Sequence, residues 1–142
     1  MVHLLDVNVL LALLDPYHVQ HDIAHHWFER RSAPKWATCA ITQNGYMRIA
    51  SQSRYSNPQP TSIALLSLAK FTQSDDHVFW PDSISLLDPI ICDSSRLNSA
   101  GQITDSYLLA LAKQNEGMLV TFDTRLVVSA VPNGEHHLHL IA

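Results

Sequence analysis

The chain has 142 residues, of which 46% are hydrophobic and 15% are charged. This composition excludes a disordered or low-complexity protein, because such chains carry few apolar residues and a high net charge. The formal net charge is −4 with only 9 lysine and arginine residues, which argues against a passive nucleic-acid-binding module with an overall basic surface. The length predicts a single domain spanning residues 1–142.

Cysteine usage and the N-terminus indicate the compartment. Cys39 and Cys92 do not form a C-x-x-C pair, so the sequence contains neither a thiol redox motif nor a cysteine zinc site. Asp6 interrupts the N-terminal apolar run early, which argues against a secretory signal. The longest strongly apolar stretch, residues 7–14, is far shorter than the roughly 20 residues of a membrane span. We therefore expect a cytoplasmic protein with free thiols and no membrane segment.

Short apolar runs alternate with helical patterns along the chain. In chain order we expect a strand at 2–5, an apolar run at 7–14, a helix at 22–31, a strand at 36–40, a helix at about 42–51, a loop at 52–60, a helix at 61–71, a strand at 77–80, a mixed segment at 83–101, a helix at 105–115, and strands at 118–122 and 138–141. Alternating strands and helices favour parallel strands joined by right-handed crossovers. The predicted fold class is therefore α/β, with three layers and a central, mainly parallel sheet flanked by helices.

Local residues predict the buried faces and the ends of these helices. Apolar residues at helical spacing are expected to face the core, namely Ile23 and Trp27 in one helix and Ile63 and Leu66 in another. Thr42 and Thr104 are expected to be N-caps. Gly117 is expected to end the helix at 105–115 in a left-handed conformation.

Three aspartates fall where a site is expected in such a fold. Asp6 ends the first strand and Asp123 ends a late strand, and ligands of open α/β sheets bind beyond the carboxyl ends of the strands. Asp105 lies in the first turn of its helix and can face the same crevice. Each residue also has a structural interpretation, since Asp105 interacts well with the helix dipole and the other two can cap helices. The functional interpretation depends on all three meeting in one place.

Converging carboxylates have a chemical consequence. Two of them about 4 Å apart repel by about 4 kcal/mol at an effective dielectric constant near 20, so one keeps its proton or a cation binds between them. Oxygen-only ligands favour magnesium or manganese. Such an ion lowers the pKa of a bound water and stabilises a phosphoryl oxygen, which is the chemistry of phosphodiester hydrolysis.

The sequence also resembles a known family, the PIN-domain proteins, in the VapC-like branch of ribonuclease toxins from bacterial toxin–antitoxin pairs. Five segments in family order carry the resemblance: residues 6–15 (DVNVLLALLD), 37–49 (ATCAITQNGYMRI), 79–82 (FWPD), 103–112 (ITDSYLLALA) and 119–123 (LVTFD). The resemblance implies a magnesium-dependent endoribonuclease, with Mn²⁺ able to substitute. It also implies an RNA substrate, a cognate antitoxin protein and a homodimer.

The resemblance assigns roles to individual residues. Asp6 and Asp105 match the metal-binding aspartates, and Asp123 matches the late acidic residue that completes the catalytic set. Asn8 matches a polar residue that supports the first aspartate, and Thr121 is expected to support the site near Asp123.

One position departs from the family pattern. The family places a glutamate in the helix after the second strand, where this chain has Gln43, Asn44 and Gly45. Gln43 is therefore expected to support a metal-bound water rather than to bind the metal. The departure leaves open whether one metal or two are bound.

Basic and histidine residues offer further candidates. Arg48 and Arg125 are expected to contact RNA phosphates, with Arg54 a weaker candidate, and ordinary solvated arginines are the alternative. His21 and His25 lie four residues apart without the glutamate of a metalloprotease motif, which favours a solvated helix face or a partner surface. Three C-terminal histidines are expected at the surface, namely His136, His137 and His139.

Two other function classes compete with the nuclease. A catalytically weak or inactive PIN-like module that binds RNA or protein is motivated by the missing glutamate, and it predicts binding that is insensitive to a chelator. A phosphoacceptor or phosphatase domain is disfavoured, because the segment Asp6-Val7-Asn8 lacks the second aspartate of a D-x-D motif.

Overall fold

The structure is a computed structural model that describes the whole chain, residues 1–142. The strands are β1 (His3–Leu5), β2 (Trp36–Cys39), β3 (His77–Trp80), β4 (Met118–Thr121) and β5 (Leu138–Leu140). The helices are α1 (Val7–Leu14), α2 (His21–Glu29), α3 (Ala40–Ala50), α4 (Thr61–Phe71) and α5 (Gln102–Gln114), with short 3₁₀ turns η1 (Ser94–Arg96) and η2 (Gly134–His137). The apolar run at 7–14, which periodicity left without an assignment, is helix α1.

All five strands are parallel and lie in one sheet in the order β3-β2-β1-β4-β5. The predicted α/β fold with a parallel sheet is therefore confirmed. The chain moves outward from β1 to β3 and then returns to the other side of β1 for β4. This reversal places a topological switch point between the carboxyl ends of β1 and β4, where ligands bind in folds of this kind.

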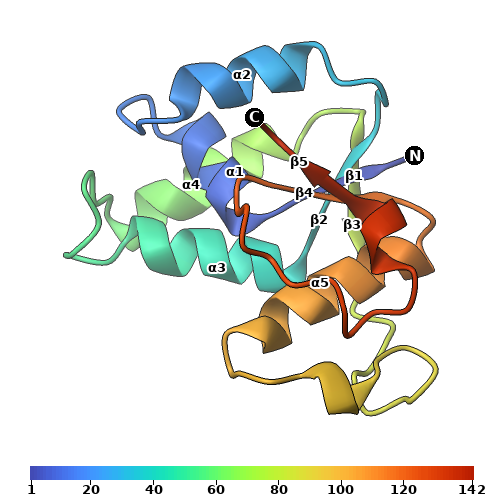
Figure 1. The fold of residues 1–142 in the computed structure, drawn as a ribbon. Coiled ribbons are helices and arrows are strands. Elements are labelled where there is room, and N and C mark those ends of the chain that lie inside the picture. Colours follow the sequence, from blue (N-terminus) through green and yellow to red (C-terminus); the bar gives the residue numbers. More distant parts are fainter.

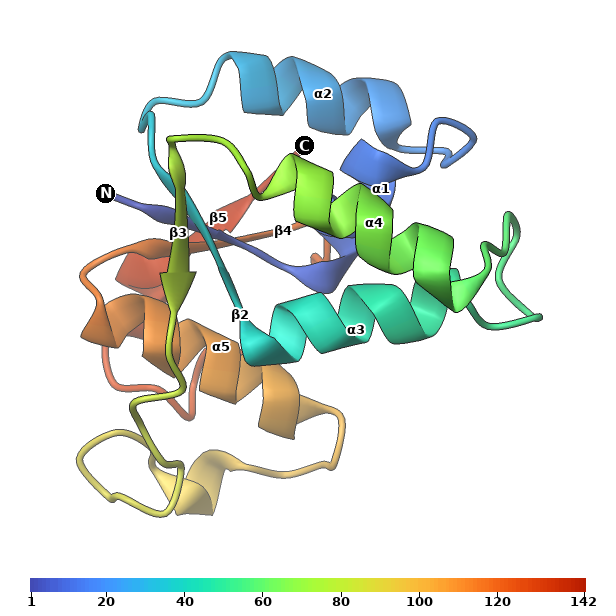
Figure 2. The same cartoon turned by 180° about the vertical axis from the view of Figure 1, so that it is seen from behind.

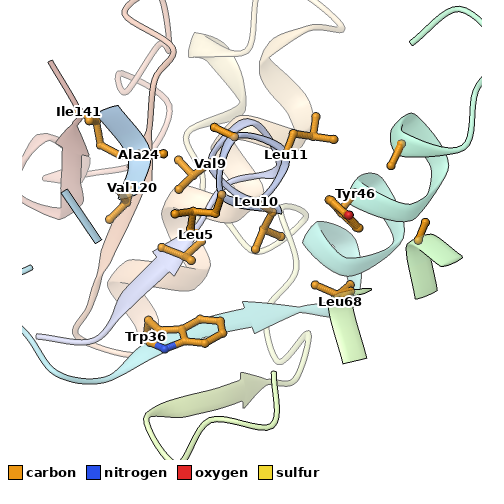
Figure 3. Close-up of a cluster of buried hydrophobic side chains, with 14 residues drawn as sticks. Leu5, Val9, Leu10, Leu11, Ala24, Trp36, Tyr46, Leu68, Val120 and Ile141 are labelled. Carbon is orange, nitrogen blue, oxygen red and sulfur yellow. The ribbon is translucent and has the colours of Figure 1, made fainter. Parts of the chain in front are cut away.

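Helices cover both faces of the sheet (Figures 1 and 2), with α1 to α4 on one side and α5 on the other. The sheet separates two hydrophobic cores, because successive side chains of a strand point to opposite faces. Leu5, Trp36 and Val120 pack into the core beneath α1 (Figure 3). Leu4 and Leu119 pack into the second core, against α5.

Two predicted helix caps are wrong by a few residues. Helix α3 begins at Ala40 with Cys39 as N-cap, and the hydroxyl of Thr42 accepts a hydrogen bond from the Cys39 N–H at 3.0 Å. Helix α5 begins at Gln102 after Gly101, so Thr104 lies inside its first turn. In both cases the chain enters the helix earlier than the threonine, and the threonine of α3 stabilises the start from its third position.

The turn after α5 also differs from the prediction. Glu116, with φ of 53°, takes the left-handed conformation, and no glycine in the chain has a positive φ. Gly117 is required for space instead, since a Cβ there would lie 2.5 Å from the Val2 carbonyl oxygen and 2.6 Å from the Trp80 ring. A glycine at this point lets α5 pass directly into β4 beside the first strand.

Three of the four residues predicted to face the core are largely exposed. Ile23 is 46% exposed, Ile63 45% and Leu66 56%, whereas Trp27 packs against the core as predicted. Small residues take the buried positions, namely Ala24 in α2 and Ala64 in α4, together with Leu68. Alanines allow these helices to approach the core closely. Since α4 has apolar residues around most of its circumference, periodicity could not distinguish its buried face.

Cys39 and Cys92 are free and buried, as expected. No helix has the length and apolar character that crossing a membrane requires.

Candidate active site

Two of the three predicted aspartates lie at the switch point of the sheet. Asp6 directly follows β1, and Asp123 lies just beyond β4, the neighbouring strand. Asp6 is only 8% exposed and is the N-cap of α1, where one of its carboxylate oxygens accepts a hydrogen bond from the Val7 N–H at 2.7 Å. The expected capping role of Asp6 is therefore real, and it leaves the second oxygen for another partner.

That partner is Thr121, the last residue of β4. Its buried hydroxyl donates a hydrogen bond to the second oxygen of Asp6 at 2.8 Å. The hydroxyl oxygen of Thr121 in turn accepts hydrogen bonds from the side-chain amide of Asn8 at 3.0 Å and from the N–H of Asp123 at 3.1 Å. One hydroxyl thus joins Asp6, Asn8 and Asp123.

Asn8 connects α1 to the segment after β4. Its Oδ1 accepts a hydrogen bond from the Phe122 N–H at 3.2 Å, while its amide nitrogen donates to Thr121. Asn8 therefore forms no hydrogen bond with Asp6 and is connected to it only through Thr121. The sequence indicated Asn8 and Thr121 as supporting residues, but only the structure shows that Asn8 donates to Thr121 and Thr121 donates to Asp6.

Asp105 enters from the opposite layer, in the first turn of α5. Burial, followed by the negative charges of Asp6 and Asp123, raises the pKa of Asp105 to about 6. Burial also raises the pKa of Asp6; the hydrogen bonds from Thr121 and Val7 oppose this, and the charge of Asp123 adds to it. The three carboxylates are thus electrostatically coupled.

No cationic side chain compensates this group of acids. The ion pairs of the molecule join Arg31 to Asp76, Arg96 to Asp93 and His136 to Glu135, and none involves the three aspartates. The three aspartates do not form a preassembled metal site, since no group of three or more His, Cys, Asp or Glu side chains is placed so that it could hold a metal ion. Magnesium keeps several waters and takes only one or two carboxylates, so an uncompensated, oxygen-only group of this kind fits it.

Gln43 lies outside this hydrogen-bond network. Its amide nitrogen donates to the Thr38 hydroxyl at 3.0 Å, and that hydroxyl lies 2.7 Å from Nε2 of His77. Gln43 also lines a small hollow between α3 and α4 with Met47 and Leu68. The structure therefore shows no contact of Gln43 with the three aspartates.

The two arginines predicted to contact RNA are exposed and form no ion pair. Arg48 lies in the last turn of α3. Arg125 follows Asp123 closely, and its backbone N–H donates to an Asp123 carboxylate oxygen at 2.9 Å. The Asp123 carboxylate thus fixes the turn that carries the Arg125 side chain.

The histidines have structural contacts that the sequence did not reveal. The expectation of a solvated face is wrong for His21 and His25, because ring nitrogens of the two lie 2.7 Å and 2.9 Å from the carbonyl oxygens of Ala12 and Leu13. They satisfy carbonyls that the end of α1 leaves without intrahelical partners. No sequence signal connected α2 with these carbonyls.

Of the C-terminal histidines, His136 is exposed as predicted, whereas His139 is partly buried. His139 accepts a hydrogen bond from the Trp27 indole N–H at 3.0 Å. Its ring also stacks on buried His3, whose Nδ1 has no partner. Burial, followed by the charge of His139, lowers the pKa of His3 to about 4, so His3 is neutral at pH 7.

Comparisons with known proteins agree on one family. A model of the PIN domain matches residues 3–131. The ribonuclease VapC44 of Mycobacterium tuberculosis is 48% identical over 136 residues, which cover 95% of this chain and 96% of the relative. Ribonuclease VapC39 of the same organism is 43% identical over 131 residues, covering 92% of this chain and 94% of the relative.

Solved structures share the fold at low sequence identity. The crystal structure of M. tuberculosis VapC20, a toxin that cleaves the sarcin–ricin loop, has a TM-score of 0.67 at 10% identity and covers 92% of this chain and 96% of that one. A toxin–antitoxin complex from Klebsiella pneumoniae has a TM-score of 0.60 at 20% identity and covers 99% of this chain and 98% of that one.

Proposed function

Because the chain belongs to the PIN-domain family, and within it to the VapC ribonuclease toxins, we propose that it is a magnesium-dependent endoribonuclease. It acts as the toxin of a toxin–antitoxin pair. The observation that carries this proposal is the position of Asp6 and Asp123 at the carboxyl ends of the neighbouring strands β1 and β4, joined through Thr121 and without an ion-pair partner. The charges of both raise the pKa of Asp105, which enters from α5.

The proposed roles combine the family pattern with the hydrogen bonds around Asp6. Asp6 and Asp105 hold the metal, which supplies an activated water and stabilises charge on a phosphoryl oxygen when it is bound. Asp123 completes the acidic site and helps to position the attacking water. Thr121 and Asn8 orient Asp6, because Thr121 donates to its free oxygen and Asn8 donates to Thr121. Arg48 and Arg125 provide positive charge for RNA phosphates.

Mg²⁺ is the proposed ion, with Mn²⁺ able to substitute, since both prefer oxygen ligands. The acidic set has three carboxylates, because Gln43 is neutral and bonds to Thr38. A single ion matches a set of only three carboxylates. The role proposed for Gln43 is limited to supporting a metal-bound water.

The proposed partners are an RNA substrate, a cognate antitoxin protein and a second copy of the chain, all in the cytoplasm. An apolar surface supports the two protein partners. Ile63, Leu65 and Leu66 of α4 are 45%, 57% and 56% exposed, and contiguous exposed apolar surface marks protein interfaces. Light scattering of the purified protein, alone and with its antitoxin, tests both assemblies.

Cleavage of total cellular RNA with end mapping tests the activity. Asp6→Asn and Asp105→Asn each reduce cleavage by more than about 100-fold in magnesium buffer, since even groups that only orient metal ligands contribute about 10–100-fold. Asp75→Asn, on an exposed loop, is the matched control and cleaves like the wild type. Equal cleavage by all four proteins, or undiminished cleavage in EDTA, contradicts the proposal.

A second candidate is a catalytically weak or inactive PIN-like module that binds RNA or protein. The bond of Gln43 to Thr38, at the position where the family has a glutamate, favours it. It predicts RNA binding that persists in EDTA with no new RNA ends, so the same assay separates the two functions.

A further inference from the structure

A cavity of about 290 Å³ lies at the end of α1 remote from Asp6, between the last turn of α1, the helices α3 and α4, and the loop at 51–60. We call it the tyrosine cavity, after Tyr17, Tyr46 and Tyr55 in its wall. Asp15 and Ser67 also line it, and none of its lining residues is a lysine or an arginine. The proposed nuclease makes no use of this cavity.

Asp15 is a buried carboxylate without a cationic partner. It is 7% exposed, and all its hydrogen-bond donors are neutral: the Tyr55 hydroxyl at 2.5 Å, the Asn57 side-chain amide at 2.9 Å and the Tyr17 N–H at 3.0 Å. Burial favours the neutral acid, but these hydrogen bonds outweigh it and hold the pKa of Asp15 below its usual value. Asp15 is therefore ionised at pH 7.

The surroundings of Asp15 add negative potential. Asp15 is the C-cap of α1, where the helix dipole is negative and a carboxylate is unfavourable. His18 is the one charged group that lowers the pKa of Asp15 electrostatically, and its influence is smaller than that of the hydrogen bonds. Buried charges in proteins are ordinarily paired, and this one lacks its counter-charge.

We propose that the tyrosine cavity binds an alkyl cation, that is, a guanidinium or a primary ammonium group on a short aliphatic chain. Asp15 supplies the counter-charge, and the faces of the tyrosine rings attract the cation. The volume suits one long basic side chain rather than a larger ligand. The source is an arginine or lysine of a protein partner, or a free aliphatic amine, since both carry the same group.

The rim of the cavity is suited to a protein partner. Tyr17 is 82% exposed at the mouth. Ile63, which is 45% exposed, lies four residues before Ser67 and therefore on the same face of α4. Apolar side chains around a buried charge resemble the centre of a protein interface, where neighbouring contacts exclude water.

Direct titration of the full-length protein tests the proposal independently of nuclease activity. We expect n-butylguanidinium to shift the amide NMR signals of Tyr17 and Asn57 saturably, with a Kd on the order of millimolar. The neutral isostere n-butylurea binds at least about tenfold more weakly, because Asp15 discriminates by charge. Two further titrations distinguish the sources of the cation. Binding of Nα-acetylarginine amide indicates an arginine side chain of a protein partner, whereas binding of putrescine indicates a free aliphatic amine.

Variants locate the binding. Asp15→Asn weakens n-butylguanidinium at least about tenfold, whereas Asp22→Asn on the exposed face of α2 leaves the affinity unchanged. If Asp15→Asn does not fold, Ser67→Lys and Ser67→Met decide the question. The lysine supplies the missing cation from α4, so Ser67→Lys melts at a higher temperature than Ser67→Met. Equal binding of n-butylurea and n-butylguanidinium, or equal melting of the two Ser67 variants, overturns the proposal.

Discussion

The two ends of α1 each carry a buried aspartate, and their environments shift the pKa in opposite directions. Asp6, at the N-terminal end, shares its surroundings with two other carboxylates, and its pKa is raised. Asp15, at the C-terminal end, receives three hydrogen bonds from neutral donors, and its pKa is lowered. The helix dipole favours the opposite assignment, because it stabilises anions at the N-terminus. Burial at Asp6 and hydrogen bonds at Asp15 therefore outweigh the dipole, and the acid with the raised pKa is the one that lies in the candidate site.

Among the residues that surround the two ends of α1, the largest expected effect comes from removing the Thr121 hydroxyl, which donates to Asp6. Thr121→Val leaves Asn8 and the Asp123 N–H without their acceptor, so we expect RNA cleavage to fall by about 10–100-fold and the free energy of unfolding by about 1–3 kcal/mol. Cleavage kinetics and urea denaturation measure the two losses. Thr121→Ser keeps the hydroxyl and is the matched control. A valine variant with the wild-type cleavage rate would show that the orientation of Asp6 does not depend on this network.

Weakening the Asp15 end separates stability from activity. Asp15→Asn lowers the free energy of unfolding by about 1–3 kcal/mol at pH 7, because a buried carboxylate loses its charge-assisted hydrogen bonds, while RNA cleavage stays at the wild-type rate. Since the pKa of Asp15 is lowered by folding, its contribution is present above the pKa of the unfolded chain and is lost as the pH falls through the folded value. Urea denaturation at pH 7 and pH 3 should therefore show a smaller difference at pH 3. A difference that is the same at both values contradicts the ionised state of Asp15.

Relieving the repulsion at the Asp6 end is expected to stabilise the protein. Without metal, Asp105→Asn raises the free energy of unfolding at pH 7 by about 1 kcal/mol, after allowance for solvent screening at a partly exposed group. The folded pKa of about 6 lies above the usual 3.8, so the folded state binds more protons between these values, and Asp105 makes stability fall as the pH rises through that window. His3 acts in the opposite sense between about 4 and 6.5, where the unfolded chain binds more protons. Comparing the wild type with Asp105→Asn isolates the carboxylate, and a variant of unchanged stability contradicts the proposed repulsion.

The smallest effects are expected at the arginines, which lie outside both buried environments. Arg48→Ala and Arg125→Ala each weaken RNA binding several-fold and reduce the slope of log affinity against log salt concentration by about 1 if each contacts one phosphate. Fluorescence anisotropy with a labelled RNA at several salt concentrations measures the slope. Lys70→Ala, on the exposed side of α4, is the control. A slope that is equal in all variants shows that phosphates are contacted elsewhere.

The parallel sheet could be predicted because each of its strands is a short apolar run bounded by polar residues. The helical faces could not be predicted as well. Ala24 and Ala64 occupy buried positions because the helices approach closely, and hydrophobicity alone favoured Ile23 and Ile63. The cap residues were misplaced for a related reason, because the geometry of the chain entering α3 decides between Cys39 and Thr42.

At the candidate site, Asp6 and Asp123 could be identified because each follows a predicted strand, and Asp105 because it lies in the first turn of a predicted helix. The supporting roles of Asn8 and Thr121 came from the family resemblance. The connection of Asn8 through Thr121 joins residues 113 positions apart, and no local pattern encodes it. The contact of Gln43 with Thr38 spans only five residues, but the 2.7 Å contact of the same hydroxyl with His77 of the neighbouring strand is tertiary and could not be predicted. The tyrosine cavity likewise arises only when the loop at 51–60 folds back onto the end of α1.

The central position of β1 has a consequence for folding. His3, Leu4 and Leu5 pair with Met118, Leu119 and Val120, each 115 positions further along the sequence. Contacts of such wide sequence separation form late, because the closure of a long loop precedes them. Asp6 therefore stays away from Asp123 until this late step. A polypeptide in which β4 has not yet paired with β1 has no assembled acidic centre, so any activity that needs both aspartates begins only after the sheet has closed around its central strand.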